Sequence, residues 1–343
     1  MKKRSGRVFH VLTLRPGGPS TLDVSLAGTK LPAYLQTSKI VRSLGGIAGT
    51  NGDFGLTPGR PAHLAAVDGE LLQTSVLGDT GRAFGLSADE SVAYAGRPRF
   101  EIEGFDPVGT KVFDIARWNE GAPRNAEIAG YSPVGGTIEP TPSDACSARL
   151  MPVGARRWGD GMDGTVQTYS VDAVRCGSAA MDRYGGTVIA ARNDGAGAAL
   201  ISGLIVGEQL DIAWSVGWPG VLDIVGGSVV LVRDGQIAVT ACNKYLCLSH
   251  PRTGIGVTAE GKIILVVVDG RSLRSGGATI VGFAKLMRNL GAVDALNLDG
   301  GGSSTMVVNG KVVNSPADGV ERTVTSGVVV LPGSDAGEIV AGP

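Results

Sequence analysis

The chain has 343 residues, 43% hydrophobic and 18% charged, which is enough for two domains or for one large domain with an insertion. Basic and acidic residues number 31 and 32, a balance that excludes the concentrated basic surface needed to bind nucleic acid or an anionic membrane. No stretch approaches the roughly 20 apolar residues of a membrane span.

The first 99 residues form the N-terminal part of the main predicted domain. Glycine is abundant, with 54 residues, and turn dipeptides are frequent, which favours a β-rich fold with short connections. We expect strands at residues 8–14, 21–26 and 46–50, and a helix at residues 37–44 that ends at Gly45. The basic start precedes an interrupted apolar run, so it is interpreted as a first strand and not as a signal peptide.

Residues 100–185 are rich in Pro, Gly, Asp and Asn and have few periodic runs, which predicts an irregular insertion. Periodicity returns in residues 186–334, the predicted C-terminal part of the main domain, which begins with strands at 187–191 and 209–214 and a short helix at 196–203. Residues 335–343 are expected to be a tail. The predicted fold class is α+β, a β-rich mixed sheet with flanking helices.

Four cysteines, an even number in loop-like surroundings, predict two disulfides among Cys146, Cys176, Cys242 and Cys247, with three pairings open. Free thiols and a zinc site are the alternatives, although a second closely spaced pair is missing for zinc. Disulfides would indicate a secreted or cell-surface protein whose leader is absent from this sequence, whereas reduced thiols would be consistent with a protein that stays inside the cell.

The last hundred residues contain a strand-helix-strand-hairpin pattern. Residues 262–268 form a continuous apolar run typical of a strand buried on both faces. Apolar residues then recur at helical spacing from Ile280 to Leu290, followed by a strand at residues 293–298. The Asn309-Gly310 dipeptide predicts a type I′ hairpin turn.

Strands joined through a helix are usually parallel, which would bring Asp269 and Asp299 to one edge of the sheet. Two carboxylates at that edge fit the separation of about 5 to 9.5 Å used by glycosidase pairs. The alternative is that each aspartate only begins a turn.

After Asp299 come Gly300, Gly301 and Gly302 and then the hydroxyl residues Ser303, Ser304 and Thr305. Glycines can take positive φ and direct successive N–H groups to one point, which predicts a nest for an anion or for sugar oxygens. Neither a lysine nor a helix comes next, so a nucleotide phosphate loop is not predicted.

Arginine is suited to bidentate phosphate binding, and the candidates are Arg252, Arg271 and Arg322. Surface or structural ion pairs are the alternative for each. His250 could act as a general acid, or it could be an ordinary loop residue before Pro251.

Several segments together resemble the phosphodiester glycosidase family: NGDF at 51–54, GRAFG at 81–85, HPRTGIG at 250–256, VDGR at 268–271, and ALNLDGGGSSTMVVNGKVVNSPADGVER at 295–322. The similarity is strong over residues 240–331, fair over 40–90 and thin between. It implies hydrolysis of the C1–O bond of a sugar-1-phosphodiester to a free sugar and a phosphomonoester. Gly55 stands where the family commonly has a second aromatic residue.

The implied site draws on Asn51, Asp53, Arg252, Thr253, Asp269, Arg271, Asp299 and residues 300–305. Asp299 and Asp269 are the first candidates for the catalytic carboxylates, and Asp53 is the reserve. No cofactor is expected to be required, although a divalent cation is compatible with the residues. The expected partner is a glycosyl phosphodiester or an anionic glycan.

Two other functions remain open at this point. The same pocket could bind anionic or phosphorylated surface glycans without catalysis. Alternatively, the aspartates could hold a metal ion in a phosphodiesterase that cuts the P–O bond.

Overall fold

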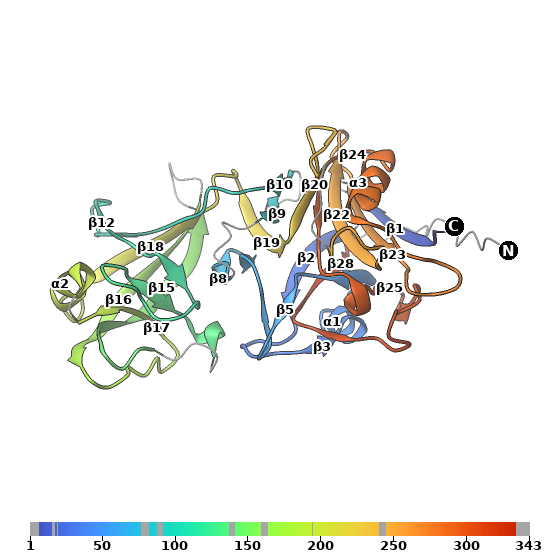
Figure 1. The fold of residues 1–343 in the computed structure, drawn as a ribbon. Helices are drawn as coiled ribbons and strands as arrows, with labels where there is room; N and C mark the ends of the chain where they lie inside the picture. The colour runs from blue at the N-terminus through green and yellow to red at the C-terminus, as the bar shows by residue number, and fades with distance from the viewer. Residues whose placement is uncertain are drawn as a thin grey trace.

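The structure is a computed structural model that describes residues 7–15, 18, 20–76, 82–87, 92–136, 141–158, 164–193, 195–239 and 245–333. Within these ranges it is β-rich, with three α-helices, and the strands are arranged in two lobes (Figure 1). The β-rich α+β class predicted from the sequence is therefore confirmed. Among the described helices, none combines the length and apolarity needed to cross a membrane.

A six-stranded sheet forms one layer of the lobe that carries both ends of the chain (Figure 1). Its order is β1 (Phe9–Leu14), β23 (Ile263–Val268), β22 (Arg252–Thr258), β24 (Ala292–Asn297), β20 (Val229–Arg233) and β21 (Gln236–Ile237). Both β23 and β24 pair antiparallel with β22. They are therefore parallel to each other, as expected, but β22 separates them.

A five-stranded sheet packs against this layer. Its order is β2 (Ser20–Leu26), β28 (Ser326–Pro332), β4 (Ala48–Asn51), β25 (Met306–Val308) and β26 (Lys311–Val312). Leu265, Leu296 and Val328 belong to the shared core between the two sheets. β25 and β26 pair antiparallel across Asn309 and Gly310, which both have positive φ.

Two helices cover the outer faces of these sheets. α3 (Ile280–Asn289) buries Phe283 and Met287 against the outward side chains of β23 and β24, while α1 (Thr37–Ser43) covers the five-stranded sheet. Alternate residues of β23 thus face opposite cores: Leu265 lies in the inner core and Val266 beneath α3. This explains the continuous apolar run of β23, because both of its faces are buried.

The second lobe is an eight-stranded sheet with α2 (Ala196–Ser202) packed on it. The strand order is β12 (Lys111–Asp114), β11 (Glu101–Phe105), β18 (Gln209–Ser215), β16 (Gly164–Gly177), β15 (Ala145–Trp158), β17 (Thr187–Arg192), β14 (Ala129–Tyr131) and β13 (Arg117–Trp118). The β13–β14 pair is parallel, whereas all other pairings of the described strands are antiparallel. The predicted mixed sheet therefore exists in this lobe and not around β23 and β24.

Another five-stranded sheet lies between the lobes: β10 (Ala93–Gly96), β9 (Arg82–Ser87), β19 (Val221–Gly227), β7 (Ala65–Val67) and β8 (Glu70–Gln73). Short pairs join β3 (Leu35–Gln36) to β27 (Thr323–Val324) and β5 (Gly55–Leu56) to β6 (Arg60–Pro61). Short 3₁₀ turns occupy Pro133–Gly135 (η1) and Gly301–Ser303 (η2).

The prediction of an irregular insertion at residues 100–185 is wrong. This region supplies six of the eight strands of the second lobe, and β17 and β18 join the same sheet from beyond residue 186. Periodicity was missed because the outer half of β15, residues 153–158, is exposed and has no apolar alternation.

Cys146 and Cys176 lie opposite each other on β15 and β16 and form a disulfide, so they lie in regular strands and not in loops. Cys247 is also disulfide-bonded, whereas Cys242 lies outside the described residues, as does the predicted tail at 335–343.

Candidate active site

Asn51, the last residue of β4, ties together three chain segments at one end of the two-sheet core. Its Nδ2 donates to the Asp299 carbonyl at 2.8 Å, and its Oδ1 accepts from the Thr253 hydroxyl at 2.8 Å and from the Thr305 backbone N–H at 3.1 Å. Asn51, Thr253 and Thr305 are fully buried. The first two therefore position the site, because these internal contacts occupy their polar side-chain atoms.

Asp299 comes directly after β24 and Leu298 and is only partly buried. Its Oδ1 accepts from the Gly300 N–H at 2.8 Å, and its own N–H donates to the Gly52 carbonyl at 3.0 Å. Burial raises the pKa of this carboxyl to about 6, helped by the negative charge of Asp53 and opposed by hydrogen bonds from Ser303 and Gly300 and by Arg322. A carboxyl with this pKa can exchange protons near neutral pH.

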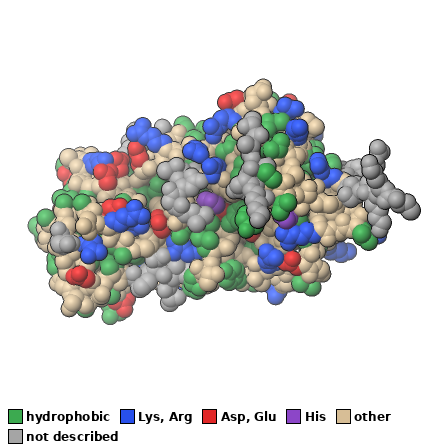
Figure 2. All heavy atoms as spheres, viewed as in Figure 1, with side chains coloured by type: hydrophobic (Ala, Val, Ile, Leu, Met, Phe, Trp, Pro, Cys, Tyr) green, Lys and Arg blue, Asp and Glu red, His purple; other side chains and the backbone are tan. Residues whose placement is uncertain are grey.

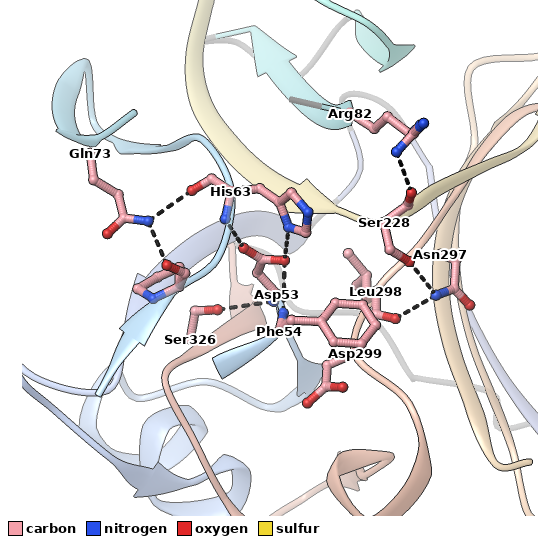
Figure 3. Close-up of polar contacts among 12 residues, drawn as sticks. Asp53, Phe54, His63, Gln73, Arg82, Ser228, Asn297, Leu298, Asp299 and Ser326 are labelled. Carbon is pink, nitrogen blue, oxygen red and sulfur yellow. Dashed lines mark hydrogen bonds and ion pairs between the residues drawn. The ribbon is translucent and has the colours of Figure 1, made fainter. Parts of the chain in front are cut away.

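Asp53 forms a buried pair with His63, a residue that sequence reasoning missed. Its Oδ1 lies 2.7 Å from His63 Nδ1, and its Oδ2 accepts from the His63 N–H at 2.7 Å. In Figure 3 the Asp53 carboxylate points toward the imidazole, while the Asp299 carboxylate points away from this pair. The chain has only 3 histidines, and one lying ten residues after Asp53 was the available signal.

Besides burial, the charge of Asp53 raises the pKa of Asp299, whereas Asp269, which the strand-helix-strand pattern placed at the same sheet edge, does not contribute to this shift. The Oδ1 of Asp269 accepts from the Ser315 N–H at 3.0 Å and from Asn314 Nδ2 at 3.4 Å. Its Oδ2 lies 3.3 Å from His10 Nε2. Asp269 therefore joins β1 to the segment after the hairpin, and it remains a candidate for the site only through its position.

The three glycines do not form the predicted nest. The Gly300 N–H is bound to Asp299, and the Gly301 N–H donates to the Pro251 carbonyl at 2.9 Å. Only Gly301 has a positive φ, of 64°. Close packing explains why the other two positions are glycine. A Cβ on Gly300 would lie 2.9 Å from the Pro251 carbonyl, and one on Gly302 would collide with Asp318 and Arg322.

A cationic cluster formed by Arg252, Arg271 and His250 lies beside this loop. Arg252 is buried and donates to the carbonyls of Ala278, Leu246 and Leu248. Burial and the charge of Arg271 lower its pKa to about 10, and burial followed by both arginines lowers the pKa of His250.

Arg271 is exposed and has a positive φ of 57°. Its guanidinium lies against Gly301, where a Cβ would come within 3.2 Å of Nη2. Within the described ranges, neither Arg252 nor Arg271 has a carboxylate at ion-pair distance, and two unneutralised guanidinium groups favour an anionic ligand. Arg322, by contrast, is paired with Asp318 at 2.9 Å from Nε to Oδ2.

The hydroxyl residues differ in their surroundings. Ser303 donates to Asp299. The hydroxyls of Ser304 and Thr305 are buried and lack a hydrogen-bond partner within the described part of the chain.

Within the described part of the chain, no group of three or more His, Cys, Asp or Glu side chains is arranged to hold a metal ion. On the face drawn in Figure 2, basic and acidic side chains are interspersed.

Residues 178–331 match the model of the phosphodiester glycosidase family. A SPbeta prophage-derived uncharacterized protein, YomE of Bacillus subtilis, is 42% identical over 102 residues, which are 29% of this chain and 16% of that protein. N-acetylglucosamine-1-phosphodiester alpha-N-acetylglucosaminidase of Mus musculus is 31% identical over 111 residues, 28% of this chain and 21% of that protein. The matches thus span less than a quarter of these relatives.

Two solved structures share the fold. A hypothetical protein from Synechocystis aligns with a TM-score of 0.72 and 19% identity over 94% of this chain and 59% of the other. A putative exported protein from Burkholderia pseudomallei aligns with a TM-score of 0.65 and 23% identity over 95% and 74%. Residues 178–331, which contain Asp299 and the cationic cluster, are thus similar to the phosphodiester glycosidase family.

Proposed function

We propose that this protein hydrolyses the C1–O bond of a sugar-1-phosphodiester, releasing a free sugar and a phosphomonoester. The match of residues 178–331 to the phosphodiester glycosidase family supports a glycosidase-type function. The observation that carries the finer proposal is the placement of Asp299, a carboxyl with a pKa of about 6, two residues before Gly301, against which the Arg271 guanidinium lies. Asp299, which could act at C1, would thus lie near the Arg271 guanidinium, a positive charge suited to binding phosphate.

The cationic cluster would bind the phosphate through Arg271 and the remaining donors of Arg252. When the C1–O bond breaks, its electron pair goes to the phosphate oxygen, where positive charge stabilises it. A phosphate is a good leaving group, so protonation by a general acid contributes less than it does with ordinary glycosides. Ionised Asp299 would then either attack C1 or take a proton from the water that attacks it.

Asp53 and His63 would be the second ionisable group of the site. The Asp53 carboxylate contacts Nδ1 and also accepts from the His63 backbone N–H, which fixes the orientation of the imidazole. Asp269 would position the end of β23 without touching the substrate, because its carboxylate is occupied by Ser315, Asn314 and His10.

The test uses an N-acetylglucosamine-1-phosphodiester incubated in ¹⁸O-labelled water, with the products separated by mass. Label in the sugar would support C–O cleavage, whereas label in the phosphate would overturn the proposal in favour of P–O cleavage. Binding without any product would favour a non-catalytic receptor for anionic glycans. Loss of activity on chelation would identify a required divalent cation.

Asp299→Asn should lower kcat by at least about 100-fold, the scale of a lost proton-transfer group. Asp294→Asn is the matched control, since Asp294 lies in the same strand, β24, and accepts from the Asp234 N–H at 3.1 Å. Near wild-type turnover in folded Asp299→Asn would remove Asp299 from the mechanism.

We further propose that the protein works outside the reducing cytoplasm, either secreted or on the cell surface. The disulfide between Cys146 and Cys176 and the disulfide-bonded state of Cys247 support this, because such bonds persist in oxidising compartments. Detection of the intact disulfides in protein taken from its native source would test it.

A further inference from the structure

A cavity of about 230 Å³ lies between β8 and the eight-stranded sheet. Its lining includes Trp118 on β13, Trp214 on β18 and Tyr169 on β16, which are 5%, 6% and 9% exposed. None of the residues placed above in the candidate active site lines this cavity. It is therefore separate from the candidate active site.

Two residues of the lining each carry a buried polar atom that has no hydrogen-bond partner within the described residues. These are the indole Nε1 of Trp118 and the hydroxyl of Thr165, which is 3% exposed. The neighbouring indole of Trp214, by contrast, donates to the Gly69 carbonyl at 3.0 Å. An unsatisfied buried polar group costs about 1 to 3 kcal/mol, so two of them beside one cavity indicate groups that a ligand satisfies.

The charge of the cavity is balanced. Glu70 and Arg156 both line it and form an ion pair at 2.8 Å, with side chains 36% and 37% exposed. This pair marks the open side, whereas the aromatic rings lie deeper. The lining thus combines aromatic surface, hydroxyl and amide groups and a neutralised charge, unlike the uncompensated arginines of the candidate active site.

We propose that this cavity binds one neutral pyranose ring of a glycan. A pyranose has an apolar C–H face for the rings of Trp118 and Tyr169 and a rim of hydroxyls for the unpartnered Trp118 Nε1 and Thr165. The volume lies just below the usual range for ligand pockets, about 300 to 1,000 Å³, which fits a single ring. The inference does not depend on the reaction proposed above.

The test is direct binding, by saturation-transfer NMR and tryptophan fluorescence, of methyl α-glucoside, methyl β-N-acetylglucosaminide and the charged sugar glucuronic acid. We expect at least one neutral glycoside to bind, more tightly than glucuronic acid does. Thr165→Val removes one unpartnered polar atom with little change of shape, and Trp118→Phe removes the other together with part of the aromatic surface. Each should weaken the binding at least about fivefold, the scale of one lost hydrogen bond.

The same variants distinguish a ligand site from a structural flaw in the lobe. Thr165→Val should keep or raise the midpoint of thermal unfolding, because no protein partner loses a bond, whereas Trp118→Phe should lower it through the packing that the smaller ring loses. Trp158→Phe, in the exposed end of β15 and outside the lining, should leave binding unchanged. Arg271→Ala should also leave it unchanged, which separates this cavity from the catalytic site. No binding of neutral glycosides, or binding unaffected by Trp118→Phe and Thr165→Val, would overturn the proposal.

Discussion

At the scale of single residues, several polar side chains of the predicted site bind other parts of the protein, and few are free to contact a substrate. Asn51 and Thr253 use their side chains to bind each other and the backbone around Asp299. Asp299 keeps a carboxylate that is partly exposed and has a raised pKa. Desolvated charge of this kind is costly for folding and is typical of functional sites.

Asp299→Asn should stabilise the protein at high pH. The folded state raises the pKa of this carboxyl from 3.8 to about 6, so folded protein binds more protons than unfolded protein between these values. The free energy of unfolding of the wild type therefore falls as pH rises through this window, and the loss of stability persists at higher pH. The variant should gain about 1 to 3 kcal/mol at pH 8 and nothing at pH 3, measured by urea unfolding. An equal gain at both pH values would contradict this account.

Asp53 and Asp269 should differ in their influence on Asp299. The charge of Asp53 helps to raise the pKa of Asp299. In a titration followed by ¹³C NMR of labelled carboxyl groups, Asp53→Asn should therefore move the Asp299 midpoint below about 6. Asp269→Asn should leave it in place, because Asp269 binds Ser315 and Asn314 instead. The reverse result would restore Asp269 as the electrostatic partner.

At the scale of elements, the unit β23–α3–β24 delivers Asp299 to the site, and the glycine loop connects this unit to the hairpin of β25 and β26. Thr279 caps α3 by accepting from the Gly282 N–H at 3.0 Å. The loop then turns through Gly301 into the short η2 and β25. The loop requires glycines because the Pro251 segment, Arg271 and Asp318 leave no room for a side chain at these positions.

Gly301→Ala and Gly310→Ala form a matched pair in which only the first should affect the site. Both glycines have a positive φ, 64° and 73°, so each alanine should cost about 1 to 2 kcal/mol in urea unfolding. A Cβ on Gly301 would press on Arg271 at 3.2 Å, whereas one on Gly310 meets nothing within 4 Å. Only Gly301→Ala should weaken the binding of inorganic phosphate, measured by thermal shift. Equal phosphate affinity in both variants would argue against a phosphate site at this loop.

At the scale of the whole molecule, the chain first supplies β1, β2 and β4 to the two-sheet lobe, passes through the sheet between the lobes into the eight-stranded sheet, and returns to complete the two-sheet lobe (Figure 1). The candidate active site therefore needs both ends of the described chain: Asn51 comes from the first passage, and Asp299 comes from the second. The second lobe has its own core and its own disulfide.

Replacing both Cys146 and Cys176 by serine should destabilise mainly the second lobe. Their sequence separation of 30 predicts a loss of about 2 to 4 kcal/mol. Hydrogen exchange should increase in β15, β16 and β17, while the carboxyl titration of Asp299 stays the same. Faster exchange in β23 and β24 to the same extent would show that the two lobes unfold as one unit.

The local sequence pattern was sufficient to predict an element when whole faces of that element are buried. The apolar run of β23, the amphipathic period of α3 and the turn glycine Gly291 can each be inferred from neighbouring residues. Such local patterns failed for β15 and β16, whose outer ends extend beyond the core. They do not place β22, since nothing between residues 262 and 298 signals that an earlier strand inserts between β23 and β24.

By itself the sequence determined the β-rich class, the strand-helix-strand order around Asp299, the four candidate disulfide cysteines and the similarity to the family, because these depend on composition, period and contiguous motifs. Only the tertiary structure decided that Asp53 and not Asp269 acts on Asp299, that His63 joins the site, and that the N–H groups of Gly300 and Gly301 bind within the protein. The reason is physical: a pKa and a hydrogen-bond partner depend on burial and on neighbours that lie far apart along the chain.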